Sequence, residues 1–290
     1  MERASGNPTM KTKKRRNSLF MAIPASIVSE LNHLRDKTEA LGWIGRAAAI
    51  YRVDEIIIYP DNPDESLLIK YVLGYMETPQ YLRKHMFKHR DELRYVGILP
   101  PLRTQHHPTR DKITQIKEGE YREGLVLKHL DETYLVDIGL ERPAEIYGKG
   151  PSKGSRVTVK ITNKAPLLGV HTKKSNLPYY WGYNLRGSNY RLGELALSPE
   201  FDLTIATSRM SDSLAKYEEK VQEEWLSSER TLIAFGSYKE GIHEIVRREG
   251  RRAEECFHYI VNTIPNQGTE TVRTEEAIHA SLALLNMFKE

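Results

Sequence analysis

The chain has 290 residues, 39% of them apolar, so it is long enough to bury one large core or two smaller ones. Its single cysteine, Cys256, excludes an internal disulfide framework and a cysteine-based zinc site, and is typical of a reducing, cytoplasmic compartment. No long uncharged apolar run occurs, so we expect neither a membrane span nor a secretory signal.

The formal net charge of +4 is unevenly distributed along the chain. Residues 1–16 carry a balance of +5, so the remaining residues sum to about −1. We expect residues 1–17 to form a disordered basic tail, because they contain few apolar side chains. Two roles fit such a tail: a solubilising arm, or a source of phosphate contacts to nucleic acid.

The first half of the chain predicts a parallel sheet covered by helices. We expect strands over residues 18–23 and 53–59, a helix from Pro24 to about residue 33, and a second helix over residues 37–51. This order of strand, helix and strand is typical of a parallel sheet with helices on its faces. Two further helices are expected within residues 64–95, with Asp64 as a cap and Pro79 as the break between them.

Residues 79–112 are basic and indicate a surface for RNA, with tyrosines and Phe87 that either stack on bases or fill the core. The candidate contacts here are Arg83, Lys84, Lys88, Arg90 and Arg103. The pair His106 and His107 does not predict a metal site, because no carboxylate or thiol cluster accompanies it at ligand spacing.

An all-β insert follows. Short alternating strands are expected over residues 124–127, 133–138, 144–147 and 156–162, and their length and spacing are typical of a small barrel. The loop of residues 148–154 is rich in glycine and lysine, and Lys149 and Lys153 are candidate RNA contacts. It lacks the Gly-Lys-[Ser/Thr] ending of a phosphate-binding loop, which excludes an NTPase of that class.

The last third returns to alternating strands and helices. Strands are expected over residues 179–186, 201–207, 230–235 and 259–264, with helices over 211–225 and 239–247 and from Thr274 onward. The last three strands each end in a polar or glycine-bearing loop and each precede a helix. In open α/β sheets, ligands bind at such carboxyl ends of the strands. No G-x-G-x-x-G follows any expected strand, so a nucleotide-like cofactor must be held differently.

The loop of residues 266–273 is far more polar than its flanks. Gly268 lets a backbone approach a ligand, and peptide groups beside it can pair with an adenine edge. The alternative is a solvated connection that ends where Thr274 caps the final helix, with Ile278 and Leu282 on its buried side. Ala277 is not Glu or Gln, so no full capping box is expected.

Several stretches together resemble a known enzyme class. They are the runs NTIPNQGTETVRTEEAI (262–278), LIAFGSYKEGI (232–242), PQYLRKHMF (79–87), YREGLV (121–126), YYWGY (179–183) and FDLTIATS (201–208). In this order they resemble the archaeal and eukaryotic branch of the SPOUT methyltransferases that carries an internal OB-like domain. The resemblance covers nearly the whole chain.

The resemblance implies an α/β fold, with a SPOUT trefoil-knotted parallel sheet flanked by helices and an inserted small OB-like β-barrel. The knotted domain would comprise residues 18–112 and 179–290, and the barrel domain residues 113–178. The implied function is S-adenosylmethionine-dependent methylation of RNA, with ribosomal RNA as the expected substrate. A homodimer with a shared active site is implied, and neither a metal nor a membrane is expected. The alternative is a catalytically inactive RNA-binding or ribosome-assembly factor on the same scaffold.

The resemblance also implies a donor site in three loops, at residues 207–209, 235–237 and 262–274. The expected donor-binding residues are Thr207, Phe235, Gly236, Ser237, Asn262, Thr263, Ile264, Pro265, Gln267, Gly268, Thr269, Val272, Thr274 and Ala277. Arg46 and Arg273 are the candidate catalytic residues, for orienting RNA or a developing anion. Arg46 can alternatively pair with an acid or reach the surface. Glu275 and Glu276 either contact the cofactor or complement the helix dipole.

Overall fold

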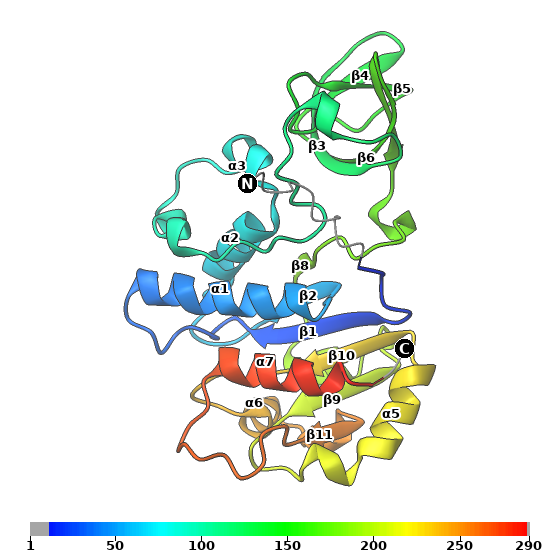
Figure 1. Cartoon of the computed structure of the whole chain (residues 1–290). Coiled ribbons are helices and arrows are strands. Elements are labelled where there is room, and N and C mark those ends of the chain that lie inside the picture. The colour runs from blue at the N-terminus through cyan, green and yellow to red at the C-terminus, as the bar shows by residue number, and fades with distance from the viewer. Residues whose placement is uncertain (1–11, 289–290) are drawn as a thin grey trace, which may run out of the picture. The chain divides into compact units, whose positions relative to one another are not determined.

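The computed structural model describes residues 12–288 (Figure 1). These residues form two compact units. The sheet unit contains residues 15–77, 90–102 and 183–288, and the barrel unit contains residues 12–14, 78–89 and 103–182. A mixed α/β fold with a parallel sheet and a separate barrel is therefore confirmed. The barrel unit is larger than the expected insert of residues 113–178, because residues 12–14, 78–89, 103–112 and 179–182 also belong to it.

The sheet unit is built on six parallel strands in the order β11-β9-β10-β1-β2-β8. Their bounds are β1 Ser18–Pro24, β2 Glu55–Tyr59, β8 Asn184–Gly187, β9 Leu203–Thr207, β10 Arg230–Ala234 and β11 Tyr259–Val261. The expected strand at 179–186 begins later, at Asn184, and the one at 259–264 ends earlier, at Val261. Since all six strands are parallel, their carboxyl ends lie along one edge of the sheet.

Helices cover both faces of this sheet. Their bounds are α1 Leu34–Ile50, α2 Ser66–Glu77, α4 Leu192–Ala196, α5 Glu218–Ser227, α6 Ile242–Arg248 and α7 Thr274–Leu285. Helices α1, α2, α5 and α7 share one apolar core with strand residues such as Leu19 and Met21. Helices α4 and α6 share the other core with Phe20 and Ala22. Successive strand residues thus point to opposite faces, as the period of a strand requires.

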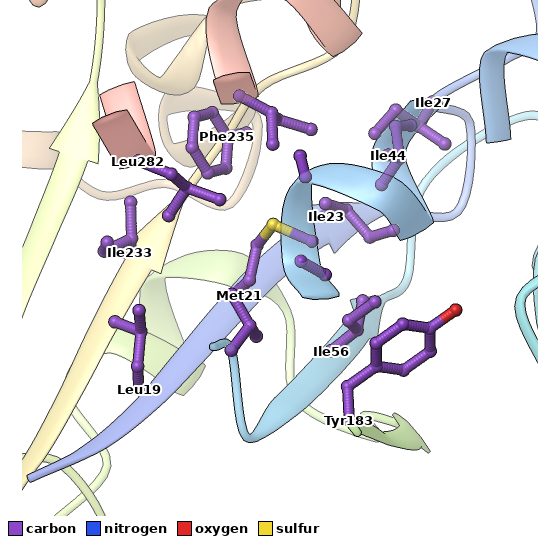
Figure 2. Packing of buried hydrophobic residues seen from close by; sticks show 14 of the residues in the cluster. Leu19, Met21, Ile23, Ile27, Ile44, Ile56, Tyr183, Ile233, Phe235 and Leu282 are labelled. Atoms are coloured by element: carbon purple, nitrogen blue, oxygen red, sulfur yellow. The ribbon is translucent and has the colours of Figure 1, made fainter. Parts of the chain in front are cut away.

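The larger core lies between the sheet and helices α1 and α7, where Met21, Ile44 and Leu282 meet (Figure 2). Its packing explains the small residues of α1. A Cβ added at Gly45 would lie 2.9 Å from Met76 Sδ and 3.0 Å from the Tyr183 hydroxyl, so glycine lets α1 approach α2 closely.

Three expected segments differ from the structure. No helix begins at Pro24, because Pro24 still pairs in β1 and Ala25 donates to the Tyr59 carbonyl at 2.9 Å; residues 25–30 form turns. The expected helix at 211–225 is split, since a 3₁₀ turn at Leu214–Lys216 precedes α5. The second helix within 64–95, α3, spans only Gln80–Met86, and 3₁₀ turns follow at Asp91–Leu93 and Val96–Ile98.

The barrel unit contains a closed five-stranded barrel in the order β3-β4-β5-β7-β6. Its strands are β3 Tyr121–His129, β4 Thr133–Asp137, β5 Ala144–Tyr147, β6 Arg156–Lys164 and β7 Leu167–Thr172. Strand β7 was not expected, because Gly169 and the neighbouring prolines and lysines obscure its alternation. Strands β5 and β7 pair in parallel, whereas the other pairs are antiparallel. Alternate residues such as Val157, Val159 and Ile161 fill the interior.

The expected disordered tail of residues 1–17 includes residues that the structure shows to be packed. Residues 1–11 lie outside the described part of the chain. Arg15 and Asn17 are buried, with 7% and 5% of their surface exposed. The Arg15 guanidinium donates to the Tyr51 carbonyl at 2.9 Å and to Asn286 Oδ1 at 2.6 Å. The prediction of disorder is therefore wrong for Arg15 and Asn17.

Candidate functional site

Three loops begin side by side at the carboxyl edge of the sheet. They follow β9, β10 and β11, which are neighbours in the order β11-β9-β10, and they span residues 208–213, 235–241 and 262–273. The sequence placed a binding site in loops that follow these three strands. The structure brings the origins of all three loops to adjacent positions.

Asn262 ties the first and third loops together. Its N–H donates to the Asp212 carbonyl at 2.7 Å, and its own carbonyl accepts from Leu214 N–H at 2.9 Å. Its Nδ2 donates to the Arg209 carbonyl at 3.1 Å, while Oδ1 accepts from Ile264 N–H at 2.9 Å. Backbone and side chain of one residue thus fix both loops, so Asn262 shapes the site.

The third loop is also folded on itself. Gln267 Nε2 donates to the carbonyls of Thr269 and Glu270, at 2.9 and 3.1 Å. The Arg209 guanidinium donates to the same Glu270 carbonyl at 2.8 Å. Around Gly268 the space is open: an added Cβ would meet no atom within 4 Å. Gln267 therefore supports the loop, whereas Gly268 presents bare backbone to the surroundings.

The second loop is a tight turn. Ser237 N–H donates to the Glu240 carbonyl at 3.0 Å, and Glu240 N–H donates back to Ser237 Oγ at 3.1 Å. A Cβ at Gly236 would lie 2.8 Å from the Glu240 carbonyl oxygen, so only glycine fits this turn without movement. Thr207 Oγ1 donates to the Ala234 carbonyl at 3.3 Å and links the first loop to β10.

Phe235, the residue before this turn, is buried. Only 1% of its surface is exposed. Its N–H donates to the Ala22 carbonyl at 3.0 Å, and its carbonyl accepts from the Tyr59 hydroxyl at 2.8 Å. Burial raises the pKa of Tyr59 well above its usual value, so this hydroxyl remains a donor. Both backbone polar groups of Phe235 are thus engaged within the fold.

Helix α7 starts one residue differently from the expected pattern. The N-cap is Arg273, not Thr274, and Arg273 N–H donates to Glu276 Oε2 at 2.9 Å. With Arg273 as the N-cap, the third helical position is Glu276 instead of Ala277. The carboxylate of Glu276 can therefore accept from the N-cap N–H, as alanine could not. Glu276 therefore caps the helix. Thr263 Oγ1 lies 2.7 Å from Ser281 Oγ and ties the third loop to α7.

The remaining expected donor-site residues lie in or beside the third loop. Pro265 and Thr269 are exposed, Val272 and Ala277 are half-buried, and Thr274 is buried as the first residue of α7. Arg273 is exposed at the amino end of that helix.

Arg46 does not join these loops within one chain. Helix α1 begins at Leu34, after the chain leaves the carboxyl end of β1, and Arg46 lies twelve residues further along the helix, about 18 Å from that start. Its Nη1 donates to the carbonyls of Pro101 and Leu102, at 2.9 Å each. The side chain thus anchors residues 101–102 to α1, a structural role that the sequence had not indicated.

Glu30 is a titratable group at this edge that sequence patterns did not single out. It lies in the turns between β1 and α1. Burial raises the pKa of its carboxyl, with smaller contributions from the charges of Glu275 and Glu65, opposed by Lys239. No periodicity could have indicated it, because the charges that act on it come from α7, from Glu65 just before α2 and from the second loop.

The predicted RNA contacts are divided between the units. Arg90 belongs to the sheet unit and stacks over the Tyr71 ring at 4.4 Å. Arg83 belongs to the barrel unit, where its Nε donates to the Thr78 carbonyl at 2.9 Å. The others are exposed residues of the barrel unit: Lys84, Lys88, Arg103, Lys149 and Lys153.

The paired histidines occupy a core position. His106 is fully buried, its Nδ1 lies 3.1 Å from Thr104 Oγ1, and its ring lies 4.2 Å from that of His107. Among residues 12–288, no three His, Cys, Asp or Glu side chains are grouped so that they could hold a metal ion. Within the same residues, no helix has the length and apolar character needed to cross a bilayer.

Comparison with known proteins places the chain. Residues 18–285 match the family described as "Putative RNA methyltransferase". The chain is 32% identical to an uncharacterized protein of Halobacterium salinarum, over 91% of this chain and 97% of that protein. It is 30% and 29% identical to the 28S rRNA (uridine-N(3))-methyltransferases of Mus musculus and Homo sapiens, over 92% of this chain and 76% and 77% of those proteins. The chain belongs to this family of RNA methyltransferases.

Family membership confirms the prediction of an RNA methyltransferase made from the sequence. An enzyme of this class requires a methyl donor. The three loops lie at the carboxyl edge of the sheet, where open α/β sheets generally bind their ligands.

Proposed function

We propose that the protein binds S-adenosylmethionine in the three loops after β9, β10 and β11 and methylates a base nitrogen of uridine in large-subunit ribosomal RNA. The observation that carries this proposal is the tie between the first and third loops at Asn262. The names of the mouse and human relatives supply the acceptor.

The residues present fit this donor. Adenosine is neutral and is recognised by amide and carbonyl groups, and the third loop offers the exposed residues Pro265, Asn266, Gly268 and Thr269. Open space beside Gly268 leaves room for a ligand against the main chain. When bound, S-adenosylmethionine supplies an activated methyl group, so the protein has to position the acceptor and handle one proton.

Arg273 is suited to the acceptor. Its guanidinium lies at the amino end of α7, where the helix dipole adds positive charge. A uridine base nitrogen must lose its proton to become nucleophilic, and the resulting anion is stabilised by such a positive end. The nearby Glu30, with its raised pKa, is suited to accept the proton.

We further propose that the active form is a homodimer of SPOUT type. Trp43 and Ile50 on α1, Leu284 on α7 and Met287 just after α7 are exposed, and the two helices pack together. A second copy covering these apolar side chains would also bring its own Arg46 to the interface, which is the way an arginine remote from the loops could serve catalysis.

The knot and the OB-like barrel belong to the same proposal. The chain leaves β11 at one edge of the sheet and α7 packs against α1, a return path that supports the knot implied by the resemblance. The five-stranded closed order of the barrel supports the OB-like assignment. The buried, unpaired Cys256 supports a reducing compartment such as the cytoplasm.

Calorimetry with S-adenosylmethionine tests the donor site. We expect the wild type to bind, and Gly268→Ala to bind at least tenfold more weakly with an unchanged Tm, because the added methyl meets no atom of the protein and can only meet the ligand. Equal affinity of the two proteins would remove the third loop from the site.

Nucleoside mass spectrometry of ribosomal RNA from a deletion strain tests the substrate. Loss of one methyluridine, restored by the wild-type gene, is the expected result. A protein that binds ribosomal RNA but neither binds the donor nor changes this pattern would instead be an inactive assembly factor.

A further inference from the structure

Acidic and basic residues of the barrel are segregated along the sequence. Residues 129–147, which include β4 and β5, contain five acidic residues and one arginine. No Asp or Glu occurs from residue 146 to residue 193, a stretch that includes β6 and β7. The basic residues of the barrel part of this stretch are Lys149, Lys153, Arg156, Lys160, Lys164, Lys173 and Lys174. The segregation is invisible in the net charge of +4.

Strand register places one lysine at the centre of the basic side. Lys160 pairs with Tyr121 of β3 on one side and with Val170 of β7 on the other. Its Nζ lies 5.9 Å from the centre of the Tyr121 ring, and Val170 is 45% exposed. These three residues form an outward-facing row across three strands, in which an ammonium group lies beside an aromatic ring.

More lysines gather at one end of the same side. Thr172 pairs with Thr158, so Lys173, the next residue, lies level with the start of β6. The loop that holds Lys153 leads into this start of β6. The amino-terminal segment adds to it, because Lys14 Nζ donates to the Ser175 carbonyl at 3.3 Å and Lys13 bridges to Tyr179. Three separate segments therefore bring cations to one end of the barrel.

We propose that this surface, the β6–β7 face defined by Lys14, Lys153, Lys160, Lys173 and Val170, binds the phosphate backbone of the substrate RNA. The proposal rests on the proposed RNA methylation. Barrels of this type commonly bind oligonucleotides over their second and third strands, which correspond here to β4 and β5. The acidic residues of β4, β5 and their loops repel phosphate, whereas the β6–β7 face attracts it, so the contact is displaced around the barrel.

A charge-matched pair of triple variants tests the proposal. The test variant is Lys153→Ala with Lys160→Ala and Lys173→Ala. The control variant is Lys112→Ala with Lys117→Ala and Lys128→Ala, three exposed lysines of the same unit that lie outside the β6–β7 face. Binding of a fluorescent large-subunit ribosomal RNA fragment is followed by anisotropy from about 50 to 200 mM KCl, the range over which phosphate contacts are salt-dependent.

We expect the test variant to bind roughly tenfold or more weakly than wild type at the highest salt, with the slope of log affinity against log salt reduced by about 2, since each lost phosphate contact removes about 0.7 to 0.9. The control variant should stay within about threefold of wild type, because it leaves the face intact. Equal losses in both variants would overturn the proposal. So would a larger loss from Tyr147→Ala, because Tyr147 is the exposed aromatic residue of β5.

Binding is measured without a methyl donor, so this proposal and the proposed function fail separately. If the test variant loses RNA but retains donor binding by calorimetry, the β6–β7 face stands. If the wild type binds the RNA through this face and never methylates it, the proposed methylation is wrong and the proposed RNA-binding face is still supported. If the test variant binds RNA as the wild type does and methylation proceeds normally, the face fails alone.

Discussion

The two proposed binding regions, the carboxyl edge of the sheet and the β6–β7 face of the barrel, would recognise their ligands by different means. At the sheet edge, the side chains of Asn262 and Arg209 donate hydrogen bonds to carbonyls of the loops themselves. A ligand would therefore contact a backbone surface that is already formed. On the barrel face, Lys160 and Lys173 present charged ends from rigid strands or just beyond them. Geometry therefore dominates the first region, and summed charge dominates the second. We expect a single substitution at the sheet edge to lower donor affinity strongly, and each substitution on the β6–β7 face to lower RNA affinity by a similar, additive amount.

The largest expected effect comes from Arg122, which supports the barrel from within. It is fully buried; its Nε donates to the Ile138 carbonyl at 2.8 Å and its Nη2 to the Arg110 carbonyl at 2.9 Å. Arg122→Ala should lower the free energy of unfolding of the barrel unit by roughly 3–5 kcal/mol, because these carbonyls lose their donor and Glu120 loses one of its two arginine partners.

Denaturant unfolding, followed with RNA and donor binding, measures this effect. RNA affinity should fall with the barrel, whereas donor binding by the sheet unit persists. Arg142→Ala is the control, since this exposed arginine makes one bond, to the Lys164 carbonyl at 3.2 Å, and should cost less than about 1 kcal/mol. Equal losses from the two substitutions would show that Arg122 does not support the barrel.

A smaller effect is expected at the edge from Gly236→Ala. The new Cβ would lie 2.8 Å from a backbone oxygen, so the turn of residues 236–241 must move. We expect S-adenosylmethionine affinity to fall about tenfold, which corresponds to about 1.4 kcal/mol, and Tm to fall as well. RNA binding through the barrel should be unchanged. Unaltered donor affinity together with a lowered Tm would separate this turn from the donor site.

The smallest expected effect concerns Glu30 and pH. Because its folded-state pKa is raised by burial, the folded protein binds more protons than the unfolded chain above the ordinary glutamate pKa, and stability falls as pH rises through that window. Glu30→Gln should therefore raise Tm at pH 7 to 8 and leave it unchanged near pH 4. The exposed Glu223→Gln is the control, and the same shift in both variants would refute the assignment.

The sequence predicted much of the fold because its strands are distinctive. The apolar run at β2 and the alternation at β4 identify strands by local composition alone. Pro24 misled for the opposite reason: proline suits a helix start, but pairing with Tyr59 across the sheet keeps it extended. At Pro24 the strand pairing with β2 therefore outweighed the preference of proline for the first turn of a helix.

The sequence predicted that polar loops follow three strands, and the strand order β11-β9-β10 brings the starts of those loops together. The binding of a ligand there stays a prediction. The role of Asn262 depends on the path of the first loop, and the anchoring role of Arg46 depends on residues 101–102, more than fifty positions away. The charge division of the barrel can be read in the sequence, but the strand register is needed to place Lys160 beside Tyr121 and Val170.

Arg15 has a practical consequence for anyone who shortens the chain. Its guanidinium joins the residues before β1 to the end of α1 and to Asn286 after α7, like a clasp between the first and last parts of the sheet unit. A deletion that reaches residue 15 would remove the basic residues before it and would also take away the hydrogen bond that holds the end of the final helix. Trimming should therefore stop before that arginine, so that any loss of RNA affinity can be attributed to missing charge.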